Sequence, residues 1–77
     1  MDPRRPDYQQ RLMAARQRAI DARNRFTRLP ADAAGRLEIQ RALSAAIDIL
    51  SHQIPDVENM ERLLEEVDAG LARAERP

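Results

Sequence analysis

Apolar side chains recur every three or four residues along three stretches of the chain, and prolines separate these stretches. The first stretch, about residues 5–29, keeps a 4-3-4-3 spacing through Tyr8, Leu12, Ala15, Ala19, Ala22, Phe26 and Leu29. This is the a/d pattern of a helix that packs lengthwise against another helix. Pro30 ends the stretch, because the residue before a proline is disfavoured in the α region.

The second stretch, about residues 32–53, predicts a helix that is apolar on more than one side. Its main stripe consists of Ile39, Leu43, Ala46, Ile47, Leu50 and Ile54. Leu37 and Ile49 lie about 120° away from that stripe, at 100° per residue. Asp32 suits the start of the helix, where a carboxylate meets unpaired amides, and Gly35 weakens the first turn. Because apolar residues on several sides favour contact with two neighbours, we expect this helix to be the central one.

The third stretch, about residues 56–74, predicts a helix with a single strong apolar stripe. The stripe consists of Val57, Met60, Leu64, Val67, Leu71 and Ala74, and Leu63 widens it. Pro55 separates this helix from the second, and Asp56 and Glu58 suit its first turn. Gly70 is the weak point of the pattern.

Three helices of roughly 30–38 Å, joined by short proline-containing turns, predict one all-α domain over residues 1–77 with an antiparallel, up-down-up three-helix bundle. The alternative is a helical hairpin of the first two helices, with the third helix detached or packed on a partner. Large apolar side chains are scarce: the chain has one Phe, one Tyr and no Trp. So thin a core leads us to expect that a partner or a second copy contributes to stability.

Charge is distributed unevenly although the net charge is zero. Residues 1–30 carry eight arginines against three aspartates, whereas residues 55–77 carry seven acidic side chains against three arginines. A basic first third is one signature of nucleic-acid or membrane-surface binding. The chain has no lysine clusters or stacking aromatics, however, which favours a basic first helix lying beside an acidic third helix. We therefore do not expect nucleic acid or membrane as partners.

The residues that usually carry chemistry are nearly absent from this chain. It has no cysteine, and its one histidine, His52, falls in the last turn of the second helix, where a structural role is expected. No serine lies in a Gly-x-Ser-x-Gly context, and two glycines cannot form a phosphate-binding loop. The segment MDPRRPDYQQRL lacks an apolar stretch of signal-peptide length. We therefore expect a cytoplasmic protein that is not an enzyme, with no catalytic residues, cofactor or metal site.

Some apolar residues lie outside the three main stripes and are candidates for partner binding. Met13 and Ile20 are seven residues apart on a second, narrower stripe of the first helix. Ala42, Ala45 and Ile49 share one flank of the second helix. These five residues are either a docking strip for a partner helix or an extension of the contacts within the bundle.

One segment resembles a known family. Residues 41–51, with the sequence RALSAAIDILS, are similar to the last helix of small type III secretion co-chaperones of the YscE/PscE type, which help to hold the needle subunit soluble. The preceding Arg- and Gln-rich helix is also similar, so the resemblance covers about residues 8–54. It implies a helical hairpin that pairs with a larger helical-repeat chaperone, the two together keeping the needle subunit unpolymerised.

The resemblance also implies roles for matching positions: Leu43, Ile47 and Leu50 would be hairpin core, and Ala42 and Ile49 partner surface. Members of that family end near the position of Pro55, whereas a third helix follows here and could cover that surface. The leading hypothesis is a helical co-chaperone or adaptor, with a type III secretion needle subunit as one candidate client. The alternatives are a self-associating helical module, as a homo-oligomer, and an Arg-rich nucleic-acid-binding or phage-type inhibitor protein.

Overall fold

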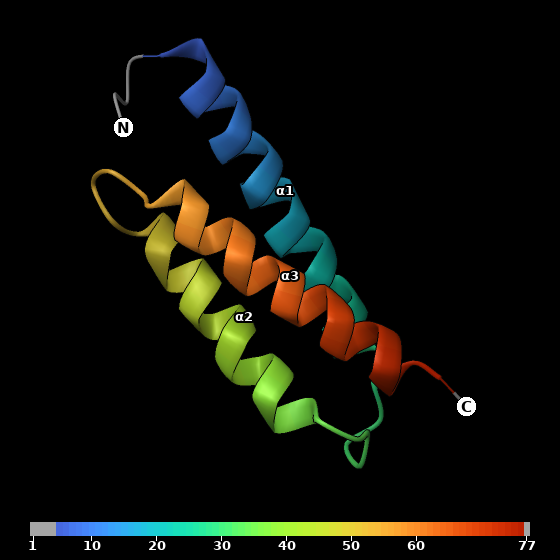
Figure 1. Cartoon of the computed structure of the whole chain (residues 1–77). Helices are drawn as coiled ribbons and strands as arrows, with labels where there is room; N and C mark the ends of the chain where they lie inside the picture. The colour runs from blue at the N-terminus through green and yellow to red at the C-terminus, as the bar shows by residue number, and fades with distance from the viewer. Residues whose placement is uncertain (1–4, 77) are drawn as a thin grey trace.

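The computed structural model describes residues 5–76, so residues 1–4 and 77 of the expected domain lie outside the described part. It contains the helices α1 (Pro6–Thr27), α2 (Arg36–Leu50) and α3 (Val57–Ala74). α2 runs antiparallel to both others in an elongated bundle of 43 × 17 × 16 Å (Figure 1). Each helix packs against the other two. The predicted all-α, up-down-up bundle is therefore confirmed, and α3 is not detached from the hairpin.

The start of α2 differs from the expectation. Asp32 does not cap this helix; the helix begins after Gly35, whose φ of 74° lies in the left-handed region that glycine adopts without a steric penalty. Residues 28–35 consequently form a longer connection than the sequence suggested, and α2 is the shortest helix, with 15 residues. By contrast, Asp56 caps α3 as its sequence position implied: the amide of Asn59 donates to Asp56 Oδ1 at 3.1 Å.

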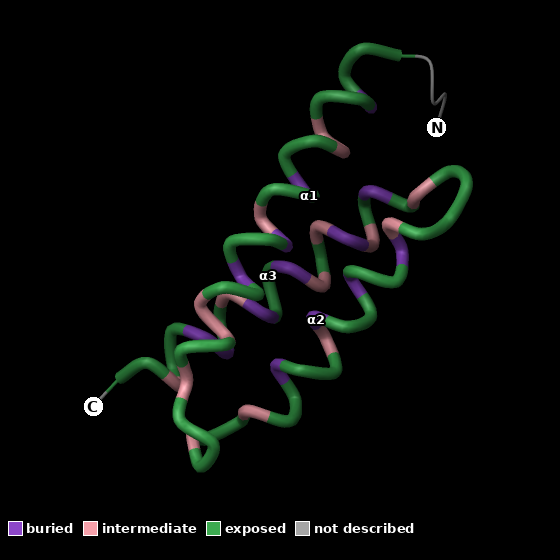
Figure 2. Tube along the Cα trace, turned by 180° about the vertical axis from the view of Figure 1, so that it is seen from behind, coloured by how far each residue is buried: buried purple, intermediate pink, exposed green. Residues whose placement is uncertain are grey.

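α3, not α2, is the central helix, so the sequence-based expectation on this point is wrong. The largest side chains that are fully buried all belong to α3: Met60, Leu64, Leu71, Val57 and Val67. Figure 2 shows buried positions recurring along its whole length. Of the two apolar residues outside the main stripe of α2, Leu37 is 55% exposed and Ile49 is buried, while Ile54 of that stripe lies in the turn after α2 and is 60% exposed.

Small side chains on α1 let the other helices approach it closely. Ala15 and Ala19 pack in one cluster with Ala46, Ile49, Met60 and Leu64. Ala22 packs in a second cluster with Ile39, Leu43, Val67 and Leu71. At the far end, Tyr8 is buried and its hydroxyl donates to the carbonyl oxygen of Pro55 at 2.9 Å. This bond ties the beginning of α1 to the loop before α3.

The α1–α3 contact is edged by ion pairs at seven-residue intervals. Arg11 pairs with Glu61, Arg18 Nη2 donates to Asp68 Oδ2 at 2.9 Å, and Arg25 Nε donates to Glu75 Oε2 at 3.2 Å. Each acid lies fifty residues after its arginine, which is the register of two parallel helices. The expectation that the basic first helix lies beside the acidic third helix is thus confirmed.

No helix in the described part of the chain is both long enough and apolar enough to cross a membrane.

Candidate helix-docking groove

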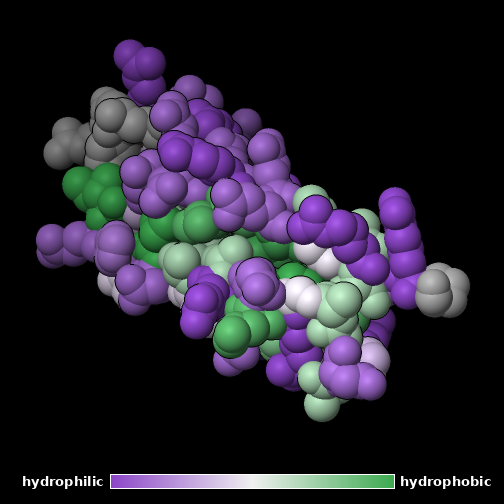
Figure 3. Space-filling view, turned by 60° about the horizontal axis from the view of Figure 1, so that its bottom comes forward, coloured by the Kyte–Doolittle hydropathy of each residue, from purple (hydrophilic) through white to green (hydrophobic). Residues whose placement is uncertain are grey.

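Several large apolar side chains remain exposed after the bundle has formed. They are Met13 (69%), Ile20 (38%), Leu37 (55%), Ile47 (37%) and Ile54 (60%). Hydrophobic side chains reach the surface in a band between hydrophilic rows on the face that Figure 3 shows. Single exposed apolar residues are common on protein surfaces, so the residues of interest are those that lie together.

Three of these exposed residues border one groove between α1 and α2, which we term the α1–α2 groove. It is formed by adjoining hollows that share Arg16, Leu50 and the Met13–Ile20 stripe. α2 contributes Ile47 and Leu50, and α1 contributes Gln9, Leu12, Met13, Arg16, Gln17, Ala19, Ile20 and Arg23. Pro55 lies at one end of the groove. The groove is therefore an elongated, mainly apolar channel along the bundle.

The helix packing explains why a groove forms on this side. α1 packs more extensively against α3 than against α2, and α3 fills the space between them from the opposite side. Leu50 is only half-buried, and Ile47 is exposed although the residue before it, Ala46, is fully buried. The apolar floor between α1 and α2 thus stays open to a further element.

Two groups of α1 arginines have different surroundings. Arg11, Arg18 and Arg25 make the ion pairs with α3. Arg16 and Arg23 line the groove and are exposed, and they form no ion pair with any of the residues 5–76. The groove therefore combines apolar walls with two positive charges that the bundle leaves uncompensated.

The ion pairs with α3 change the acid–base properties of their members. The hydrogen bond from Arg11 lowers the pKa of Glu61, and that from Arg25 lowers the pKa of Glu75. In return, the same bonds raise the pKa of Arg11 and of Arg25. Glu61 and Glu75 therefore stay ionised to a lower pH than free glutamates do, and their pairs with Arg11 and Arg25 contribute to the packing of α1 against α3.

The residues expected to bind a partner fall into three groups. Met13 and Ile20 are exposed and lie together in the groove. Ala45 is exposed, whereas Ala42 is half-buried and lines a different hollow, between α2 and α3. Ile49 is 6% exposed and packs in the core, so at this position the apolar flank extends the contacts within the bundle.

Ile47 takes the place that helical periodicity assigned to Ile49. The apolar stripe of α2 spans more than half a turn, and both isoleucines lie near an edge of it. Which edge is buried depends on the position of α3, and a single helix pattern does not contain that information. No signal in the sequence separates the two, since Ile47 and Ile54 keep the same seven-residue interval as Leu43 and Leu50.

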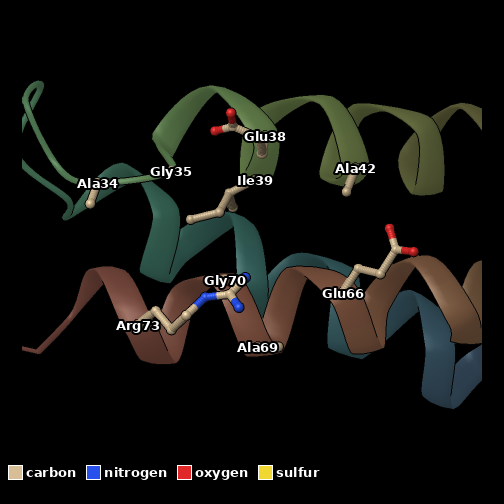
Figure 4. Close-up of a pocket in the computed structure, with 9 residues that line it drawn as sticks. All are labelled: Ala34, Gly35, Glu38, Ile39, Ala42, Glu66, Ala69, Gly70 and Arg73. Atoms are coloured by element: carbon tan, nitrogen blue, oxygen red, sulfur yellow. The ribbon is translucent and has the colours of Figure 1, made fainter.

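The hollow between α2 and α3 is a poorer candidate for a site. It is lined mainly by small residues around Gly70, with Glu38, Glu66 and Arg73 at its edges. Figure 4 shows these three charged side chains spread along the hollow and pointing in different directions. Polar groups that do not converge on one point cannot orient a small ligand.

His52 is exposed and lies 3.8 Å from Asp48, with Nε2 facing Oδ2. Within residues 5–76, no group of three or more potential ligand side chains is placed to hold a metal ion. The groove is thus the feature with the clearest binding character.

Comparison of the chain with protein-family models, with curated proteins and with solved structures finds no match.

Proposed function

We propose that this chain is a helical protein–protein interaction module that acts as a cytoplasmic co-chaperone or adaptor, and that a helix of its partner docks in the α1–α2 groove. The observation that carries the proposal is the exposure of Met13, Ile20 and Ile47 around one channel. An amphipathic helix that lies in such a channel buries its own apolar face and these side chains together. On this proposal the chain binds and does not catalyse.

The resemblance over residues 8–54 suggests candidates for the partner: a type III secretion needle subunit or its helical-repeat chaperone. The groove supports a partner surface formed by α1 and α2, but with Ile47 in place of Ile49. α3 covers the opposite side of the hairpin and leaves the groove open. A third helix is therefore compatible with a docked partner in this arrangement.

The Arg-rich nucleic-acid hypothesis receives less support. Three of the α1 arginines are engaged with carboxylates of α3, and this reduces the free positive charge on that side of α1. Affinity for nucleic acid depends on the number of cations that can contact phosphates. Self-association is the second candidate, and crosslinking from the groove distinguishes it from an adaptor.

Site-specific photo-crosslinking in the native host tests the proposal. A photo-reactive amino acid is placed at Ile20 in the groove or at Leu37, an exposed apolar residue outside it. We expect a specific protein crosslink from position 20 and none from position 37. Ile47→Asp should abolish the crosslink from position 20 while the far-UV circular dichroism stays unchanged.

Two results would contradict the proposal. If the same proteins crosslink from both positions, the groove is not selective. If position 20 crosslinks only to another copy of the chain, the protein is a self-associating module and the adaptor function is wrong. Mass spectrometry of the crosslinked band distinguishes these results and shows whether the partner is a needle-type subunit or a helical-repeat protein.

A further inference from the structure

We infer that the occupant of the α1–α2 groove is an amphipathic helix whose buried face carries acidic side chains at seven-residue intervals between apolar ones. This inference rests on the proposed function and adds the chemistry of the partner. Its basis is the position and the surroundings of Arg16 and Arg23.

Arg16 and Arg23 lie between the apolar residues of α1 and α2 that an occupant of the groove would contact. At 100° per residue, Arg16 and Arg23 fall on α1 between its buried face and the stripe formed by Met13 and Ile20. Both also line the same hollow as Ile47 of α2. A helix that contacts Met13 or Ile20 on one side and Ile47 on the other therefore lies over both arginine side chains.

Covering an arginine has a large energetic consequence. A charge that is removed from water without a partner is strongly destabilising, whereas a carboxylate in bidentate contact offsets much of that cost. Arg16 and Arg23 have no acidic partner among residues 5–76 that could compensate them. The occupant must supply the carboxylates, and a purely apolar helix would be rejected.

The spacing of the two arginines fixes the spacing of the acids. Arg16 and Arg23 are seven residues apart, which corresponds to roughly 10 Å along α1. α1 already pairs with acids at this spacing on its other side, since Glu61 and Asp68 of α3 and Glu75, which directly follows α3, are also seven residues apart. An occupant nearly parallel or antiparallel to α1 with acids at i and i+7 can reach both groove arginines.

A second copy of the chain fits the groove less well. In a two-fold symmetric dimer through this face, the same patch meets itself, so Arg16 and Arg23 would approach the equivalent arginines of the other copy. Like charges in a water-excluded contact oppose association. Charge complementarity therefore favours an acidic partner helix over self-association.

The test uses three fluorescent synthetic peptides and the full chain. The peptides share one stapled helical scaffold with leucines for the groove, and carry Glu, Gln or Lys at the two positions seven residues apart. Fluorescence anisotropy at low salt gives the affinity for each. We expect the Glu peptide to bind at least tenfold more tightly than the Gln peptide, and the Lys peptide to bind most weakly.

A charge swap provides the decisive comparison. R16E/R23E should reverse the preference and bind the Lys peptide at least tenfold more tightly than the Glu peptide. R41E/R62E is the matched control, because it makes the same change in net charge at exposed arginines outside the groove. The control should retain the preference for Glu, and all variants should show unchanged helicity.

The remaining outcomes separate the two proposals. If the three peptides bind equally, or if R16E/R23E does not reverse the preference, the acidic occupant is overturned while the docking groove stands. If no peptide binds but position 20 still crosslinks to a partner protein, the acidic occupant is also overturned. If neither experiment gives binding, both proposals fail. If the parent chain itself dimerises in sedimentation and Ile47→Asp prevents that dimer, the occupant is a second copy and the acidic partner helix is overturned.

Discussion

Gly70 of α3 lies directly against Ile39 of α2: a Cβ atom added to Gly70 would come within 2.7 Å of Ile39 Cγ1 (Figure 4). At such a distance either the Ile39 side chain or one of the two helices must shift, and Cγ1 of a β-branched residue has little freedom to move. The glycine that weakens α3 as an isolated helix therefore permits its close contact with α2.

Gly70→Ala should destabilise the protein even though alanine is the better helix former. The gain in helix propensity is up to about 1 kcal/mol, whereas overpacking a tight contact costs about 1–3 kcal/mol. Urea denaturation followed by circular dichroism measures the difference. Ser44→Ala, at an exposed position of α2, is the control and should be neutral or slightly stabilising. An increase in stability for Gly70→Ala would show that the helices separate easily here.

The two neighbouring isoleucines of α2 should respond oppositely to a charge. Ile49→Asp places an unpaired carboxylate among Ala46, Met60 and Leu64 and should abolish folding, as should Leu43→Asp and Leu64→Asp. Because Ile47 lies at the surface, the Ile47→Asp variant should retain most of its helicity. Circular dichroism of purified variants checks this. Equal loss of helicity in both isoleucine variants would contradict the assignment of Ile47 to the groove.

The sequence was sufficient to predict the three helices and their antiparallel order. The a/d spacing and the two prolines are local signals that act through the backbone and through one face of each helix. The start of α2 was missed because Asp32 looked like a cap, whereas the left-handed Gly35 leads into the helix without a side-chain cap. A glycine in a first turn and a glycine before a helix look the same in a sequence.

The sequence indicated the residues on the α1 side of the groove but not those on its α2 side. Helical periodicity places Met13 and Ile20 outside the main stripe of α1, and their exposure in the structure agrees with the first of the two alternatives that this position left open. Ile47 was assigned to the main stripe and Ile49 to a flank, and the structure reverses the two, because which side of α2 is buried depends on the side from which α3 approaches. The identity of the central helix was missed for the same reason: it depends on packing among all three helices.

Tyr8→Phe should cost about 1 kcal/mol of stability. The substitution keeps the buried ring and removes only the hydrogen bond from the hydroxyl to the carbonyl of Pro55, at 2.9 Å. Tyr8→Ala provides the comparison and should cost several times more, about 3–5 kcal/mol, since it also leaves a cavity. Chemical denaturation measures both. A Phe variant as stable as the parent would mean that water replaces the hydroxyl at this end of the bundle.

The ion pairs between α1 and α3 should make stability depend on pH in the acidic range. The pKa values of Glu61 and Glu75 are lowered in the folded chain, and the largest cause is the hydrogen bond that each accepts, from Arg11 and Arg25 respectively. A lowered pKa contributes stability that is fully present above the unfolded value of about 4.3 and is lost as the pH falls through the folded value. We therefore expect the melting temperature to fall below about pH 4.3.

Removing the two carboxylates should flatten this acid dependence. The double variant Glu61→Gln/Glu75→Gln should lose less melting temperature between about pH 6 and about pH 3 than the parent chain, in scans spaced by about one pH unit. Glu65→Gln/Glu66→Gln is the control, because it removes two exposed acids that form no ion pair in the described part of the chain. Added salt should reduce the difference between parent and double variant, since the paired side chains are partly exposed and screened. If both double variants follow the same curve, the pairs do not stabilise the fold, and the acidic third helix contributes only through its apolar stripe.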